Sequence, residues 1–233
     1  MTPITETLAN IPLFHGRHQE ADSQRCVMEC VAFVAGEPHS DHPKCACEVV
    51  TALAIYANDS GGEAVVDALP ARILRMAGSN LGRLVSEQRA YFLADYAVRT
   101  LMPAVLRDYA QRYPNAAAVT EEQLQALSAV SPIRDKTALH AARTAVANLN
   151  CDGLLADNLL VHSRLVAMLN ILPYGHLYNI ADKFTSLDQA TSANCDLIAL
   201  LDALLDIGDT QPVPVDEKVA RRIKELAQVA EPA

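Results

Sequence analysis

The chain has 233 residues, enough for one large domain or two small ones, and a formal charge of −9. This acidic balance excludes broad binding to nucleic-acid phosphates, which requires clustered lysine and arginine. Alanine and leucine supply much of the 51% hydrophobic content, aromatic residues make up only 5%, and tryptophan is absent. Because strands favour β-branched and aromatic residues, the composition predicts an all-α protein.

The distribution of apolar residues and cysteines points to the cytoplasm. No apolar stretch approaches the roughly 18 residues of a membrane-spanning helix, so no membrane association is expected. The first residues, MTPITETLANIPLF, lack the positive start and continuous apolar stretch of a secretory signal. The six cysteines are therefore expected to be reduced thiols.

The chain-wide pattern predicts an irregular multi-helix bundle of about eight to ten helices. Residues 1–22 have no sustained period and are expected to form an N-terminal arm. Residues 23–210 are expected to form the helical domain, with a sub-boundary near 114–120. Residues 211–233 are expected to form a linker and a peripheral C-terminal helix.

Capping and stop signals divide the first half of the domain. A helix is expected from a Ser23 cap to about Ala35, where Gly36 would end it. The segment GEPHSDHP is expected to be a loop. Pro43 suits the first turn of a second helix, which the sequence NDSGG would end.

Prolines are expected to interrupt the next two helical segments. Pro70 should separate two short helices within residues 63–77. Residues 80–113 form the longest helical pattern, and Pro103 is expected to bend or break it. Asp95 and Arg99, four residues apart, are expected to form a surface pair. The residues expected on the inner side of this helical pattern are Leu81, Leu84, Val85, Phe92, Tyr96 and Leu101. Further helices are expected at about 135–149, 153–172, 195–207 and 216–229. The helix at 195–207 has a stripe of leucines at helical spacing, and the helix at 216–229 is charged.

Residues 26–47 hold the densest group of reactive side chains, with four of the six cysteines and two of the seven histidines. The pattern His39-x-x-His42-x-x-Cys45-x-Cys47 contains paired ligands at spacings that tetrahedral zinc uses. The candidate metal ligands are His42, Cys45, Glu37 and Cys47. No established zinc finger or knuckle has this spacing, so no cofactor is expected, and zinc is the alternative.

Two alternatives to a metal site remain open for the same corner. In a structural reading, Cys26 and Cys30 are core residues, and Asp41 or His42 caps the second helix ahead of Pro43. In a catalytic reading, Cys45 lies in the first turn of that helix, where His42 and the helix dipole favour its thiolate.

The segment CVMECVAFVAGEPHSDHPKCACEVV resembles a recurrent stretch, ME-x-x-A-x-x-AGE-x-x-SDHP-x-C, of uncharacterised helical bacterial and phage proteins. The matches are Met28-Glu29, Ala35-Gly36-Glu37, Ser40-Asp41-His42-Pro43 and Cys45, and the segment departs at Glu48, where the family has proline. The resemblance implies no activity or cofactor. It favours five positions as the functional corner: Glu29, Glu37, Asp41, His42 and Cys45.

These observations lead to two hypotheses for function. The first is a non-enzymatic interaction or regulatory protein, for which a phage is one possible source. Its partner is expected to be a protein, and its 29–45 helix-loop-helix corner is expected to be structured. The second is a zinc-dependent or thiol-based enzyme that uses the same corner. The first is favoured because no second cluster of side chains is available to bind a substrate.

Overall fold

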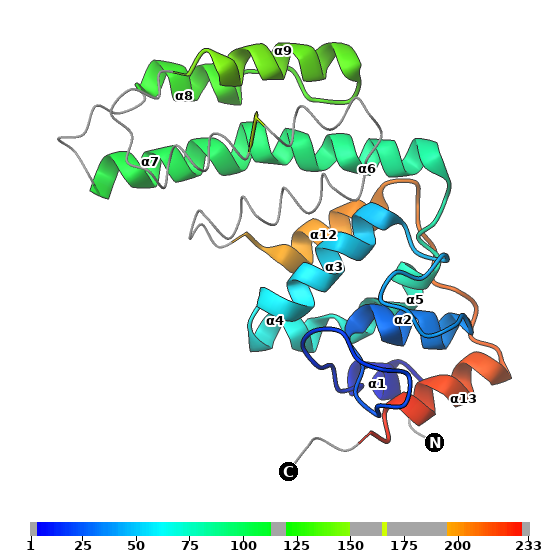
Figure 1. The fold of residues 1–233 in the computed structure, drawn as a ribbon. Coiled ribbons are helices and arrows are strands. Elements are labelled where there is room, and N and C mark those ends of the chain that lie inside the picture. The colour runs from blue at the N-terminus through cyan, green and yellow to red at the C-terminus, as the bar shows by residue number, and fades with distance from the viewer. Residues whose placement is uncertain (1–3, 113–119, 150–164, 167–194, 230–233) are drawn as a thin grey trace. The chain divides into compact units, whose positions relative to one another are not determined.

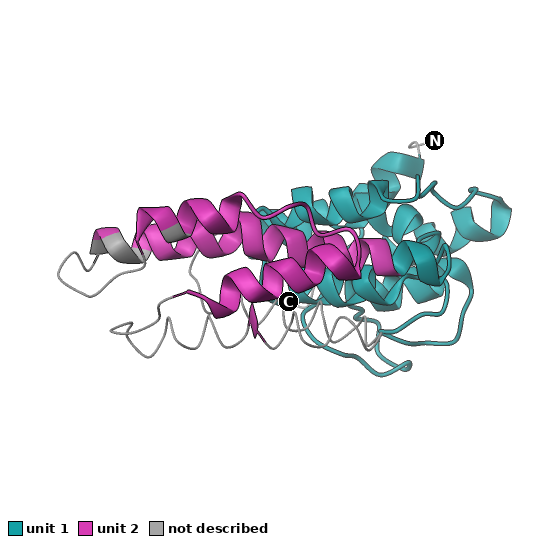
Figure 2. Cartoon of the chain, turned by 90° about the horizontal axis from the view of Figure 1, so that it is seen from above, with its two compact units in different colours: residues 1–86, 196–233 teal, residues 87–195 magenta. Residues whose placement is uncertain are grey.

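The computed structural model describes residues 4–112, 120–149, 165–166 and 195–229. Within these ranges every regular element is a helix, which confirms the all-α class (Figure 1). The chain divides into two compact units, unit 1 with residues 1–86 and 196–233 and unit 2 with residues 87–195 (Figure 2). No helix of the described ranges is both long and apolar enough to cross a membrane.

Unit 1 begins with three helices, α1 (Ile4–Ala9), α2 (Val27–Ala35) and α3 (Glu48–Ser60). α2 is buried along most of its length because apolar residues occupy nearly every position. It ends at Gly36, whose left-handed φ of 77° lets its N–H bond back to the carbonyl of Phe33. The predicted stop at Gly36 is therefore confirmed, as is the end of α3 at the NDSGG segment.

Both α2 and α3 begin later than the sequence predicted. α2 has Cys26 rather than Ser23 at its N-cap, because the carboxylate three residues on accepts the Cys26 N–H over 2.8 Å. α3 has Cys47 at its N-cap, where the Ser79 hydroxyl accepts the Cys47 N–H over 2.8 Å. Pro43 therefore lies in the preceding loop rather than in a first helical turn, and the capping roles expected for Asp41 and His42 are wrong.

The segment after α3 turns at a proline, as predicted. It consists of α4 (Glu63–Ala68), a 3-10 turn η1 (Pro70–Arg72) and α5 (Ile73–Ala77). Pro70 stands at the first position of the 3-10 turn, where its missing N–H costs nothing. Leu69, Ile73 and Met76 are buried, so this bent segment contributes directly to the core of unit 1.

The C-terminal part of unit 1 contains α12 (Leu197–Asp206) and α13 (Glu217–Leu226), each capped by an aspartate. α12 packs against α3 and α4 through its predicted leucine stripe, and α13 packs against α1 and α2 (Figure 1). Arg72 binds Asp202 with two hydrogen bonds of 2.8 and 2.5 Å, so η1 is also attached to the charged face of α12. Residues near both ends of the sequence thus build one core.

Unit 2 contains one long helical segment and two shorter helices. α6 (Arg83–Tyr96) begins in unit 1 and continues through a π segment, η2 (Ala97–Leu101), into α7 (Met102–Arg112). Pro103 does not break the helix, because the wider π turn just before it accommodates the missing N–H. α8 (Glu121–Ser128) packs against η2 and α7, and α9 (Lys136–Ala147) packs against α8.

Two other expectations for this region have mixed outcomes. Asp95 and Arg99 form the predicted pair, with 3.3 Å between Arg99 Nη1 and Asp95 Oδ2, and Asp95 also accepts the N–H of Ile133 over 2.9 Å. Leu81 and Leu84 are 43% and 78% exposed, so their predicted place on the inner side is wrong.

The bounds of α9, α12 and α13 agree with those predicted from the sequence. Two other predicted features fall mostly on residues that the structure does not describe. The helix expected at 153–172 lies outside the described residues apart from positions 165–166. The sub-boundary expected near 114–120 likewise falls almost entirely outside them. The predicted arm contains α1, and both α1 and the C-terminal helix belong to unit 1.

Candidate functional site

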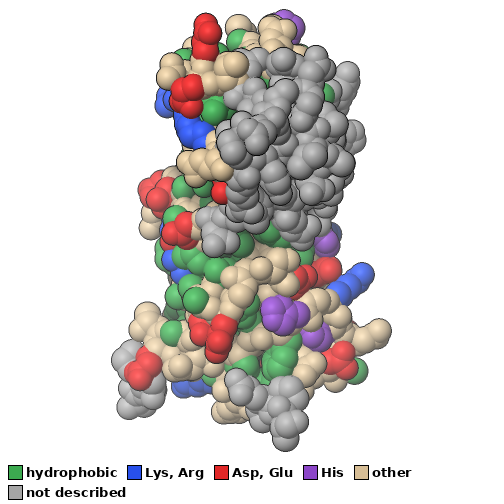
Figure 3. Space-filling view, turned by 90° about the vertical axis from the view of Figure 1, so that its left-hand side faces the viewer, with side chains coloured by type: hydrophobic (Ala, Val, Ile, Leu, Met, Phe, Trp, Pro, Cys, Tyr) green, Lys and Arg blue, Asp and Glu red, His purple; other side chains and the backbone are tan. Residues whose placement is uncertain are grey.

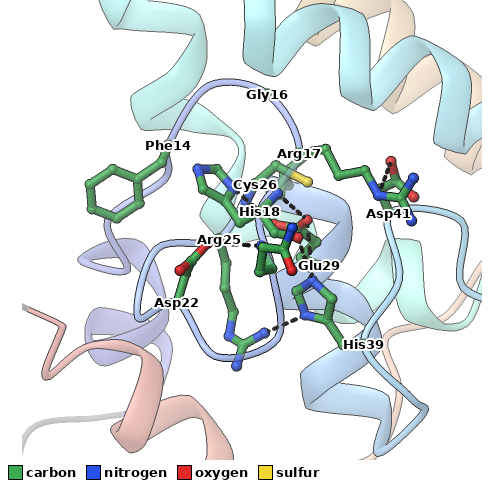
Figure 4. Close-up of polar contacts among 12 residues, drawn as sticks. Phe14, Gly16, Arg17, His18, Asp22, Arg25, Cys26, Glu29, His39 and Asp41 are labelled. Carbon is green, nitrogen blue, oxygen red and sulfur yellow. Dashed lines mark hydrogen bonds and ion pairs between the residues drawn. The ribbon is translucent and has the colours of Figure 1, made fainter.

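Glu29 is a fully buried carboxylate in the first turn of α2, and two histidines point toward it (Figure 4). Histidine and acidic side chains also lie near one another on one face of the molecule (Figure 3). Burial of an ionised carboxylate is costly unless hydrogen bonds replace its water. The surroundings of Glu29 therefore determine what this corner can do.

Each oxygen of Glu29 faces two nitrogen donors. Oε2 accepts the N–H of Cys26 at 2.8 Å and the Nδ1–H of His18 at 3.0 Å. Oε1 accepts the backbone N–H of His18 at 2.8 Å and lies 3.4 Å from Nε2 of His39. One carboxylate thus connects the N-terminal arm, the start of α2 and the loop after α2.

Arg25 fixes the orientation of the His39 ring. Its Nη1 donates to Nδ1 of His39 over 2.8 Å, and because a guanidinium cannot accept, that ring nitrogen is the acceptor. The Nε2–H of His39 then donates to the carbonyl of His18 over 2.9 Å. We call Glu29, His18, His39, Arg25 and Cys26 the Glu29 cluster.

The hydrogen bonds decide the protonation of Glu29. Burial by itself raises the pKa of this carboxyl, but the N–H groups of His18 and Cys26, together with the His18 ring, outweigh burial and lower the pKa below its ordinary value of 4.5. The Glu29 side chain is therefore an anion held by donors, and its oxygens are already occupied.

The Glu29 cluster extends into the arm through backbone hydrogen bonds. The N–H of Phe14 donates to the carbonyl of Arg25 over 3.0 Å, and Nδ2 of Asn58 donates to the carbonyl of Phe14 over 2.9 Å. The N–H of Gly16 donates to Oδ1 of Asp59 over 2.9 Å. Residues 14–18 are thus attached at several points to α2 and to the end of α3.

A cavity of about 760 Å³ adjoins this attached part of the arm. Three stretches of the chain contribute to its lining: residues 9–14, then Val66, Asp67 and Pro70, and finally Ala227 and Val229 after α13. Its volume is within the range of small-molecule sites. Most of the described residues that line it are apolar, Asn10 and Asp67 being the exceptions, but more polar than apolar surface faces the cavity. All of these residues belong to unit 1.

The functional-corner candidates from the sequence do not form one group. Glu37 lies in the loop after α2, where its Oε2 accepts the N–H of Lys44 over 2.7 Å beside the half-buried Cys45. Asp41 Oδ2 lies 3.7 Å from Nε of Arg17. His42 is exposed, and its N–H donates to the Ser40 hydroxyl over 3.0 Å. Of the five functional-corner candidates, Glu29 alone belongs to the hydrogen-bonded group with His18, His39, Arg25 and Cys26.

The candidate zinc ligands His42, Cys45, Glu37 and Cys47 are likewise not assembled. Cys47 is buried at the start of α3, where its sulfur contacts the Ser86 hydroxyl at 3.3 Å. Among the described residues, no group of three or more His, Cys, Asp or Glu is arranged to hold a metal ion. The guanidinium of Arg25 also places a positive charge within the Glu29 cluster, which disfavours a metal cation there.

The thiols of the corner are not activated. Burial raises the pKa of Cys26 to about 12, and burial together with the Glu37 carboxylate raises that of Cys45 to about 12. Burial also raises the pKa of Cys30 well above 9.0. Cys45 is not in a helix N-terminus, so the dipole effect expected to favour its thiolate is missing. The structural reading of Cys26 and Cys30 as core residues is confirmed.

Sequence reasoning missed His18 and Arg25 and ranked His39 below its neighbours. The spacing Cys26-x-x-Glu29 has the form of a capping box with cysteine in place of serine or threonine, and it could have predicted the role of Glu29. His18 had no local signal, because its contact with Glu29 joins the irregular arm to a helix.

Comparisons with known proteins do not extend this description. No family model matches the chain, and neither a curated protein nor a solved structure is similar to it. The functional conclusion therefore depends on the contacts described above.

Proposed function

We propose that the protein is a non-enzymatic interaction protein that binds a partner protein in the cavity beside residues 9–14. The Glu29 cluster holds the arm, which lines part of this cavity. The observation that carries the proposal is the buried Glu29 carboxylate, whose two oxygens accept hydrogen bonds from the arm and from the start of α2. Such a buried, satisfied anion supports a structural role rather than acid–base chemistry.

Three further observations support this proposal over the enzyme alternative. The pKa values of the corner thiols are raised, so a thiolate nucleophile is disfavoured at neutral pH. Within the ranges that the structure describes, no three or more His, Cys, Asp or Glu side chains are grouped so as to hold a metal ion. The zinc content of the purified protein tests the enzyme alternative. Free thiols at the five described cysteines suit a reducing cytoplasm, and the resemblance of residues 26–50 supports a bacterial or phage setting.

The proposal is tested by metal content and by peptide selection. We expect protein purified without added zinc to contain less than stoichiometric metal, with no difference between wild type and His42→Asn. Stoichiometric zinc that is lost in His42→Asn would overturn the proposal in favour of a metal-dependent protein. We also expect a library of random peptides displayed on phage to yield peptides that bind the full chain. These peptides should bind the wild type more tightly than they bind a Glu29→Gln variant.

A further inference from the structure

We infer that the cavity takes an irregular or extended peptide segment of the partner that carries a lysine or arginine beside an apolar residue. This inference rests on the proposed function and names the chemistry of the same site. It follows from the charge of Asp67, the backbone groups of the arm that are unpaired within the described residues, and the apolar residues among those that line the cavity.

The charge of the cavity is negative. Asp67 lines it and is exposed, and it makes no hydrogen bond or ion pair with any described residue. No lysine or arginine among the described residues lines the cavity. Arg72 of the neighbouring turn is engaged by the Ala68 carbonyl over 2.6 Å and by Asp202, so it is not the partner of Asp67. A lysine or arginine side chain of a ligand would form an ion pair with Asp67.

The ends of two helices add to this charge. α13 ends at Leu226, and Ala227 and Val229 immediately after it line the cavity. The shorter α1 ends at Ala9, which also lines the cavity. The carbonyl end of a helix carries partial negative charge, and it therefore favours a cation in its vicinity.

The arm offers backbone groups that a peptide can pair with. In the part of the chain that the structure describes, the N–H of Leu13 and the carbonyls of Ile11 and Leu13 have no hydrogen-bond partner. Phe14, directly after them, is fixed through both its N–H and its carbonyl. Residues 11–13 thus present open donors and acceptors on a rigid support, which is how a protein edge recognises a peptide backbone.

The apolar residues among those that line the cavity favour an apolar residue next to the cation, although more polar than apolar surface faces the cavity. Val66, Pro70 and Ala227 line the cavity together with residues 11–14. A volume of about 760 Å³ exceeds that of one side chain and accommodates several residues of a peptide. An apolar residue beside the lysine or arginine would bury its surface against this lining.

The experiment uses the peptides that are selected on the full chain. Fluorescence anisotropy measures their binding to the wild type and to two matched variants. Asp67→Asn removes the charge that lines the cavity, and Glu63→Gln removes an equal charge from an exposed position on the same helix, outside the lining. We expect Asp67→Asn to weaken binding about fivefold and Glu63→Gln to leave it nearly unchanged. Replacing the peptide's lysine by glutamine should weaken binding to wild type but not further weaken binding to Asp67→Asn.

A second measurement does not depend on any variant. Amide hydrogen exchange of the full chain should show the N–H of Leu13 protected when peptide is bound, whereas the exposed N–H groups of α4 should be unaffected. Selected peptides without a cation, or equal binding by the Asp67→Asn and Glu63→Gln variants, would overturn this inference while the interaction function stands. Failure to select any peptide would overturn the peptide assignment, whereas zinc lost in His42→Asn would overturn the proposed function itself.

Discussion

The guanidinium of Arg222 lies against the Cα of Gly36, where the side chain of any other residue would begin. Its Nη1 donates a hydrogen bond to the carbonyl of Val34 over 3.1 Å, so α13 provides a cap for the C-terminal end of α2. Gly36 has a left-handed φ of 77°, and glycine is therefore required here both by conformation and by the approach of α13.

Replacement of Gly36 should separate these two effects. Gly36→Ala is expected to lower the free energy of unfolding by about 2–3 kcal/mol, because the left-handed conformation is strained and Arg222 must leave the Val34 carbonyl. Gly16→Ala is the matched control, since Gly16 has a φ of 79° and nothing within 4 Å of an added Cβ. It should cost about 1 kcal/mol in urea unfolding.

The contribution of Arg222 can be isolated by a double-mutant cycle. In an Arg222→Ala background, Gly36→Ala should cost only as much as Gly16→Ala does in wild type, because the approaching guanidinium is gone. Equal costs of Gly36→Ala in the two backgrounds would show that Arg222 does not occupy this position in solution.

Removal of the Glu29 charge should be among the most damaging single changes. Glu29→Gln is expected to lower the free energy of unfolding by about 3 kcal/mol, because its amide N–H₂ would face the N–H of either His18 or Cys26 and leave that donor unpaired. Glu37→Gln is the control, since its oxygen can still accept the N–H of Lys44, and it should cost about 1 kcal/mol or less. Similar midpoints of the two variants in urea would contradict the role of the Glu29 cluster.

The stability of the wild type should depend on Glu29 in acid. The pKa of Glu29 is lower in the folded chain than its ordinary value of 4.5, so its contribution is fully present above pH 4.5 and is lost as pH falls through the folded value. The difference between wild type and Glu29→Gln in unfolding free energy should therefore shrink below pH 4.5. Carboxyl carbon shifts of Glu29 followed by NMR should give a midpoint below 4.5, and a midpoint above it would contradict the expectation.

The corner thiols should react slowly and should destabilise the fold in alkali. The pKa of Cys45 is about 12 against an ordinary 9.0, so its contribution is present below pH 9.0 and is lost as pH rises above it. At pH 8, iodoacetamide should modify Cys45 in the folded chain slower than in the unfolded chain by about two orders of magnitude. Glu37→Gln should speed this reaction, because the Glu37 charge contributes to the raised pKa.

Local signals were sufficient for much of the helical framework. Gly36 ends α2 because its φ is available to glycine at little cost, and Pro70 starts a turn because it lacks the N–H that a continuing helix needs. The leucines of α12 repeat at helical spacing and are buried. In each case the signal and the structure it specifies lie within one or two turns of each other.

The candidate site was harder to predict because its contacts join distant segments. Glu29 and His18 are separated by the irregular arm, and Arg25 and His39 lie on opposite sides of α2 in the sequence. Periodicity carries no information about such contacts. Leu84 shows the same limit in a helix, since it matches the apolar period of α6 but is exposed in its first turn.

The construction of unit 1 from residues 1–86 and 196–233 has a consequence for synthesis on the ribosome. The start of α2 can form as soon as the arm and the loop have emerged, but its C-terminal end must wait for Arg222, which lies 188 residues after Val34. At about 5–20 residues per second, all of unit 2 is translated in between, a delay on the order of 10 seconds. During that interval the apolar surfaces of α2 and α3 that later receive α13 and α12 are uncovered, so the nascent chain is a candidate client for chaperones.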